Sequence, residues 1–177
     1  KYEAYNGLFL PEIGRRVGMS DFDTMLDILD ASNAEARVLF HGYYNEEIID
    51  RLMQHQAAVF ASDSWPEPGG HQNPAAYGTF PKFLRNARER KTLSLEQVVR
   101  KMSGAAAERF RLKERGLLKE GYAADVTVFD WERVGDEENA TGDAPPVGIE
   151  HVFVNGKQIF AEGRIDAVRG AGQALLA

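Results

Sequence analysis

The sequence predicts an α/β protein that ends in a β-rich tail, and two observations carry this prediction. Two short, continuous apolar runs at 38–40 and 57–61 are separated by an amphipathic helical pattern. This alternation is typical of parallel strands covered by helices on both faces, as in an α/β barrel. Past residue 112, glycines and prolines punctuate short β-type runs. We therefore predict the last strands and helices of a barrel over 1–112 and a β-rich domain over 113–177.

Helical patterns fill much of the first 112 residues. A short amphipathic helix begins near Leu8 and stops near Gly18. Ser20 is placed to cap the next helix, whose predicted buried face consists of Phe22, Met25, Leu26 and Leu29. Asn45 is placed to cap another helix, whose predicted inward stripe consists of Ile48, Ile49, Leu52 and Met53.

Three further helices are predicted after a long loop. The segment 64–78 is rich in Pro, Gly and Asn and is predicted to be irregular, with the helical pattern resuming at Phe80. Ser94 and Gln97 form a capping-box pattern, in which each side chain binds the other residue's backbone N–H. Ser103 is predicted to cap one more helix.

The tail carries three strand patterns, over 125–129, 149–154 and 157–160. Asn155-Gly156 lies between the last two and is a strong signal for a two-residue hairpin turn. The acidic segment 135–146 has no spacing typical of metal ligands, and we interpret it as a solvated loop.

Composition excludes several classes of function. A net charge of −6 and a pI near 5.3 argue against a nucleic-acid partner, because phosphate backbones bind clustered Lys and Arg. The absence of cysteine excludes disulfides, thiolate metal ligands and a cysteine nucleophile. No apolar run is long enough to cross a bilayer, and the start of the sequence lacks a signal-peptide pattern. We therefore expect no membrane partner and a cytoplasmic location.

Three stretches together resemble the amidohydrolase superfamily. RGLLKEGYAADVTVFD, residues 115–130, looks like the family's return from the last barrel helix into its small β-domain, and 149–165 resembles the strand pair that follows. The segment from Phe60 to Asp63, followed after a loop by Tyr77-Gly78-Thr79-Phe80-Pro81, resembles the N-acyl-D-amino-acid deacylase branch.

This resemblance implies a fragment: the C-terminal part of a metal-dependent-hydrolase TIM barrel followed by part of a small β-sandwich domain. A full barrel takes about 250 residues, so the 177 residues here would hold its last quarter and lack the N-terminal barrel part. Uncovered barrel edges favour association, so we expect a homo-oligomer, a dimer or larger.

The resemblance also makes Asp63 the candidate catalytic residue. In the family, this aspartate takes a proton from a metal-bound water and passes it to the leaving amide nitrogen. Zinc lowers the pKa of bound water to about 7, which makes this transfer feasible at neutral pH. The alternative is that Ser62-Asp63 only caps a turn.

Three further residues are candidates for substrate binding: His71, Tyr77 and His41. His71 lies in the loop where deacylases carry His-Pro-Arg, whose arginine is proposed to hold the substrate carboxylate. Asn73-Pro74-Ala75 stands at that tripeptide, so the arginine is missing. For each candidate a second interpretation stays open: an exposed loop residue for His71, helix packing for Tyr77 and a polar loop residue for His41.

We therefore predict an enzyme that hydrolyses a linear amide C–N bond of N-acyl (D-)amino acids. Zinc is implied for the full-length parent, held by histidines that this sequence lacks. The chain alone is expected to bind no metal and to be inactive, because a structural or catalytic zinc takes three or four protein ligands. Two alternatives remain: a non-catalytic structural or interaction module derived from such an enzyme, and a cyclic-amide hydrolase or deaminase of the same superfamily.

Overall fold

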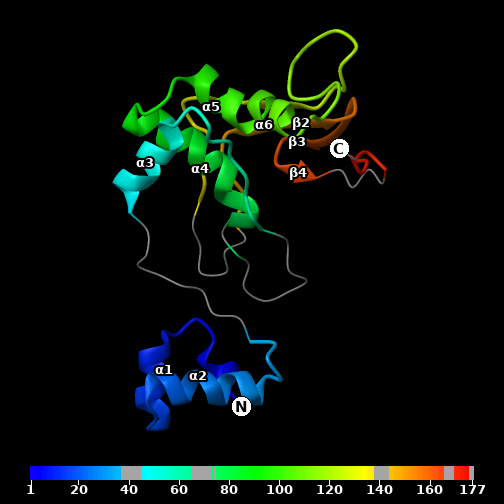
Figure 1. Ribbon diagram of the computed structural model, residues 1–177. Coiled ribbons are helices and arrows are strands. Elements are labelled where there is room, and N and C mark those ends of the chain that lie inside the picture. The colour runs from blue at the N-terminus through cyan, green and yellow to red at the C-terminus, as the bar shows by residue number, and fades with distance from the viewer. Residues whose placement is uncertain (37–44, 65–72, 74, 138–143, 166–169, 176–177) are drawn as a thin grey trace. The chain divides into compact units, whose positions relative to one another are not determined.

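The computed structural model describes residues 1–36, 45–64, 73, 75–137, 144–165 and 170–175, and these form two compact units (Figure 1). Unit 1 is Lys1–Tyr44 and unit 2 is Asn45–Ala177. The boundary predicted between 112 and 113 lies inside unit 2, where helices and strands share one core.

Unit 1 contains the 3₁₀-helix η1 (Glu3–Tyr5) and the α-helices α1 (Leu10–Val17) and α2 (Asp21–Ala31). The predicted cap is confirmed, since the Ser20 side chain accepts a hydrogen bond from the Asp23 N–H at 3.1 Å.

The predicted buried face of α2 is wrong for Phe22 and Leu26, while Met25 and Leu29 are half-buried. Thr24 is the buried residue of this helix, whereas Phe22 is 65% exposed and Leu26 is 47% exposed. The reason is the packing of α1, because a Cβ added at Gly14 would lie 3.1 Å from Thr24 Oγ1. Helix α1 therefore covers the threonine side of α2 and leaves the Phe22 side uncovered.

Unit 2 begins with four helices, α3 (Glu46–Gln54), α4 (Ala75–Arg90), α5 (Leu95–Met102) and α6 (Gly104–Arg109). The cap at Asn45 and the capping box of Ser94 and Gln97 are confirmed. Ser103 occupies the predicted N-cap position of α6, but its hydroxyl donates to the Val99 carbonyl at 2.7 Å and makes no cap hydrogen bond.

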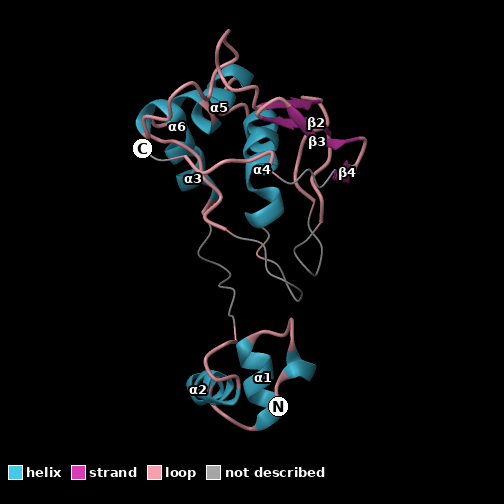
Figure 2. Ribbon diagram, turned by 90° about the vertical axis from the view of Figure 1, so that its right-hand side faces the viewer, coloured by secondary structure: helices cyan, strands magenta, loops and turns pink. Residues whose placement is uncertain are grey.

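A four-stranded antiparallel sheet lies beside these helices (Figure 2). Its strands are β1 (Val126–Phe129), β2 (Ile149–Val154), β3 (Lys157–Ala161) and β4 (Arg164–Ile165), in that spatial order. The predicted hairpin is confirmed. Asn155 (φ 49°) and Gly156 (φ 77°) both adopt the positive φ that a type I′ turn requires between β2 and β3.

The core of unit 2 joins both element types. Its buried members come from helices, from the segment before Asp63 and from the segment after β1: Met53, Phe60, Leu84, Ala87, Val98 and Val134. Partly buried Phe129 of β1 and Ile149 of β2 pack against them. Burying a side chain of this size contributes roughly 1.5–3 kcal/mol. Of the predicted inward stripe of α3, Met53 and Ile49 pack in or against this core. Ile48 is 54% exposed and Leu52 is 61% exposed.

The predicted strand at 57–61 is absent from the described residues, since 58–64 carry no regular secondary structure. A parallel strand exists only as a member of a ladder. The Phe60 N–H instead donates to the carbonyl of Lys101, the penultimate residue of α5, at 3.3 Å. The other predicted strand, 38–40, lies outside the described residues. In the described part of the chain, no helix is long and apolar enough to cross a membrane.

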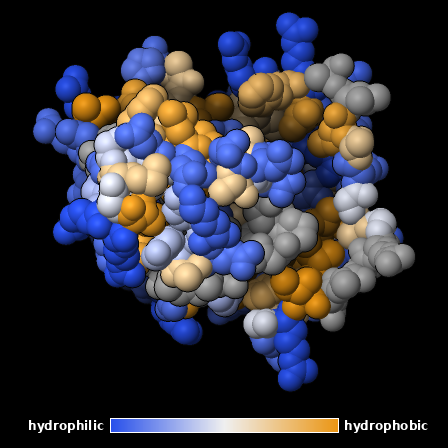
Figure 3. All heavy atoms as spheres, turned by 90° about the horizontal axis from the view of Figure 1, so that it is seen from below, coloured by the Kyte–Doolittle hydropathy of each residue, from blue (hydrophilic) through white to orange (hydrophobic). Residues whose placement is uncertain are grey.

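The surface of the chain presents apolar residues among hydrophilic ones (Figure 3). We expect self-association through such residues, because large apolar side chains exposed in water favour contact with a second molecule. Light scattering should give a mass above the 19.7 kDa of one chain. Replacing Ile48 and Leu52 together by serine should shift the mass toward monomer, while Glu47→Gln should not. A clean monomer of the unaltered chain at high concentration would contradict the expectation.

Candidate functional site

Asp63 is exposed and has a left-handed backbone conformation, with φ 49°. Few residues other than glycine adopt positive φ, and Asp and Asn are among those that tolerate it. Seven other non-glycine residues of the described chain share this conformation, so the backbone of Asp63 fits a tight turn and does not by itself assign a role to the residue.

The segment leading to Asp63 is fixed by packing three residues earlier. The Phe60 side chain is 8% exposed. Its ring stacks on Phe83 of α4, with ring centroids 4.3 Å apart and planes 24° apart. The start of the Asp63 segment is therefore attached to α4 by aromatic packing.

The chain that follows Asp63 also leads to α4, which it enters after Asn73. The helix begins at Ala75, five residues before the predicted Phe80, because the side chain of Asn73 accepts a hydrogen bond from the Ala75 N–H at 3.0 Å. Pro81 is tolerated inside the helix, although it has no N–H to donate to the carbonyl of Tyr77. Tyr77 lies in the first turn and is 39% exposed.

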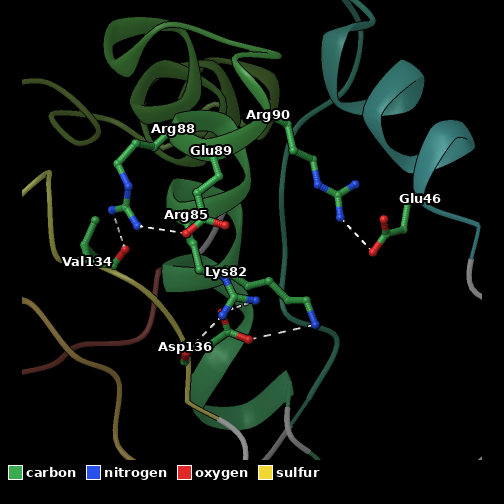
Figure 4. Close-up of polar contacts among 8 residues, drawn as sticks. All are labelled: Glu46, Lys82, Arg85, Arg88, Glu89, Arg90, Val134 and Asp136. Carbon is green, nitrogen blue, oxygen red and sulfur yellow. Dashed lines mark hydrogen bonds and ion pairs between the residues drawn. The ribbon is translucent and has the colours of Figure 1, made fainter.

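Asp136 corrects the prediction that 135–146 is a solvated loop. Its side chain is 5% exposed, and Oδ1 lies 3.0 Å from Nη2 of Arg85. Nζ of Lys82 lies 3.9 Å from Oδ2 (Figure 4). A buried carboxylate needs such partners, because removing a charge from water is costly.

Close packing explains the glycine at position 78 of the Gly-Thr-Phe-Pro motif. A Cβ at this position would lie 3.1 Å from the Cβ of Asp136. The absence of a side chain therefore lets the segment that carries Asp136 lie directly on the first half of α4.

Arginines on both sides of α4 continue this attachment (Figure 4). Arg88 donates to the carbonyls of Trp131 at 2.6 Å and Val134 at 2.8 Å. At the end of the helix, Arg90 binds α3 through Glu46 at 2.8 Å and through Asp50 at 3.2 Å. Helix α4 is thus held between α3 and the segment that follows β1.

The structure tests the predicted site residues only in part. Asp63 and Tyr77 lie at the two ends of one loop, whereas His41 and His71 lie outside the described residues. Within the described ranges, no three His, Cys, Asp or Glu side chains are grouped so that they could hold a metal ion. No sequence pattern indicated the burial of the Asp136 carboxylate, because this residue lies in an acidic stretch typical of a solvated loop.

The geometry defines a unit of helices and an antiparallel sheet, in which the segment before Asp63 packs on α4. Comparison with known proteins gives its class. Residues 11–160 match the amidohydrolase family. Because the match covers most of the chain, the chain belongs to this family. The predicted resemblance to N-acyl-D-amino-acid deacylases is confirmed by the relatives that follow.

An N-acyl-D-aspartate deacylase from Alcaligenes xylosoxydans xylosoxydans is 42% identical over 132 residues, which are 72% of this chain and 26% of the relative. A crystal structure of D-aminoacylase aligns with a TM-score of 0.83 at 28% identity, over 98% of this chain and 35% of that one.

A third relative carries a metal. The structure of N-acyl-D-glutamate deacylase from Bordetella bronchiseptica, complexed with zinc and a phosphonate mimic of the tetrahedral intermediate, aligns with a TM-score of 0.70 at 29% identity. It is covered over 32% of its length by 89% of this chain. The chain thus spans about a quarter to a third of the proteins it matches.

We expect Arg85→Met to destabilise unit 2, because it leaves the buried Asp136 carboxylate with Lys82 alone at 3.9 Å. Removing one partner of a buried pair costs about 3–5 kcal/mol, and the 31% exposure of Arg85 lowers the expected loss to about 2–4 kcal/mol. Urea unfolding measures the change in the free energy of unfolding.

The control is Arg100→Met. Arg100 pairs with Glu108 at 3.1 Å, and the two side chains are 62% and 74% exposed. Exposed pairs contribute roughly 0–1 kcal/mol. Equal losses in the two variants would show that Asp136 is not the buried partner described above.

Proposed function

We propose that the whole protein hydrolyses the amide C–N bond of N-acyl-D-amino acids and that Asp63 is its general acid and base. The observation that carries this proposal is the exposed carboxylate of Asp63 in a segment of deacylase type, between Phe60 and the Gly78-Pro81 motif. The names of the relatives support it, since they act on N-acyl-D-aspartate and N-acyl-D-glutamate.

The chemistry required of Asp63 is proton transfer. An exposed carboxylate can accept a proton from the attacking water and deliver it to the amide nitrogen as that group leaves. His71 and Tyr77 follow Asp63 in the chain, Tyr77 in the first turn of α4, and we propose that both contact the substrate. His41 is proposed as a third contact.

Zinc is proposed as the cofactor of the whole protein, because the Bordetella relative contains it. The described residues do not fit a complete zinc site, as they group no three suitable ligands. The ligands must therefore lie outside the described part of the chain, and the isolated chain is proposed to be inactive.

A non-catalytic module is the second candidate function. The position of the substrate-binding arginine in deacylases is occupied here by Ala75, which cannot bind a carboxylate. Alanine at this position is the specific observation that favours a module. Assays of the whole protein with N-acyl-D-amino acids, cyclic imides and aminated purines separate a deacylase, the other enzymes of the superfamily and an inactive module.

Asp63→Asn in the full-length protein should lower kcat by about 10²–10⁴-fold, the usual contribution of general acid and base catalysis. KM should change little, because the amide keeps the size of the carboxylate. The measurement is steady-state hydrolysis of N-acetyl-D-aspartate and N-acetyl-D-glutamate. Asp30→Asn, an exposed carboxylate at the end of α2, is the matched control and should retain full activity. An Asp63→Asn enzyme within a few-fold of the unaltered one would remove Asp63 from the mechanism.

The purified 177-residue chain should contain no stoichiometric zinc, because a stable site takes three or four protein ligands. Elemental analysis by mass spectrometry after dialysis against a weak chelator measures the zinc content. One tightly bound ion per chain would contradict the prediction and would place the ligands within these residues.

A further inference from the structure

Lys101, near the end of α5, binds the segment that leads to Asp63. Its ammonium donates to the carbonyl of His55 at 2.6 Å and to the carbonyl of Ala58 at 3.1 Å. Its own carbonyl accepts the hydrogen bond from the Phe60 N–H at 3.3 Å. One residue of α5 thus makes three hydrogen bonds to 55–60, a segment that belongs to no helix or strand.

The charge of Lys101 suits this position. His55 is the C-cap residue of α3, and the carbonyls at a helix C-terminus lack partners within the helix and carry partial negative charge. An ammonium that donates to them makes charge-assisted hydrogen bonds, which are shorter and stronger than neutral ones. An apolar side chain of the same length would remove this donor from both carbonyls, and the His55 carbonyl would keep only the hydrogen bond from the Ala58 N–H at 3.0 Å.

The same ammonium also contacts the aromatic anchor of the segment. Nζ lies 5.9 Å from the centroid of the Phe60 ring, within the range of a cation–π interaction. That ring stacks on Phe83 of α4. Backbone and side chain of the segment are therefore both attached through residues of α4 and α5.

Asp63 follows this attached segment directly. Three residues span at most about 10 Å of chain, so the position of Phe60 limits where the Asp63 carboxylate can lie. The backbone of Asp63 is held at φ 49°, a conformation that persists only when the surrounding structure constrains it. The contacts of Lys101 reach as far as Phe60, three residues before Asp63.

We propose that Lys101 is a positioning residue for the acid and base Asp63, acting through the backbone of 55–60. This inference rests on the proposed function of Asp63. A structural role alone would change stability and leave the chemistry of the remaining folded enzyme intact. A positioning role changes kcat, because a displacement of about 1 Å at a reacting group can cost on the order of a hundredfold in rate.

The test uses Lys101→Met and Lys101→Arg in the full-length protein. Lys101→Met keeps the length of the side chain and removes the ammonium, so kcat should fall about tenfold or more with KM changed less than threefold. Lys101→Arg keeps the positive donor and should recover most of kcat. The matched control is Arg100→Met, which removes an exposed cation from the same helix and should leave kcat unchanged.

Two further readouts separate positioning from stability. Hydrogen exchange of the amides at 58–63 should become faster in Lys101→Met and stay unchanged in Arg100→Met. In the Asp63→Asn background, Lys101→Met should have no additional effect on kcat, because the residue through which it acts is already removed. If Lys101→Met does not fold, Lys101→Gln replaces it with the same criteria.

The outcomes distinguish the two hypotheses. If Asp63→Asn is fully active, the proposed function fails and the inference fails with it. If Asp63→Asn is impaired but the folded lysine variant has normal kcat, the proposed function stands and the inference is overturned. An equal effect of Lys101→Met in both backgrounds also overturns it, because Lys101 would then act independently of Asp63.

Discussion

The ion pair between Arg85 and the buried carboxylate of Asp136 is the interaction on which the arrangement of unit 2 depends. It requires Gly78 on the same helix, because a side chain there would meet Asp136 at 3.1 Å. Together with the hydrogen bonds of Arg88, it attaches the segment after β1 to α4. The sheet and the helices therefore share one core because cations of a single helix bind the chain between β1 and β2.

The candidate site is attached to the same helix, α4. Phe83 lies between Lys82 and Arg85 in the sequence. Its ring stacks on Phe60, which attaches the segment before Asp63 to α4. A change in the position of α4 would thus move the sheet contacts and the Asp63 segment together. The Gly-Thr-Phe-Pro motif lies on the helix that makes both contacts. Its glycine leaves space for Asp136, and Phe83 of the same helix stacks on Phe60.

Local signals in the sequence predicted the elements, and non-local packing decided the rest. Ser20, Asn45 and the Ser94 capping box act within one helical turn, so their sequence patterns suffice to locate helix starts. The exposure of Phe22 could not be predicted in this way, because it depends on which side of α2 is covered by α1. The burial of Asp136 likewise depends on Arg85, 51 residues earlier in the chain.

The predicted hairpin of β2 and β3 is confirmed, whereas the strand predicted at 57–61 is absent from the described residues. The dependence on non-local packing explains this difference as well. An antiparallel hairpin completes its hydrogen bonds with the next few residues, so β2 and β3 form around Asn155-Gly156 without help from distant chain. A parallel strand needs neighbours that are separated from it by a whole crossover. The run at 57–61 has α5 as its hydrogen-bond partner in the described residues, and the chain spans only 35% of the D-aminoacylase it aligns with. In the described residues, ring stacking on Phe83 and hydrogen bonds with Lys101 attach this segment to α4 and α5.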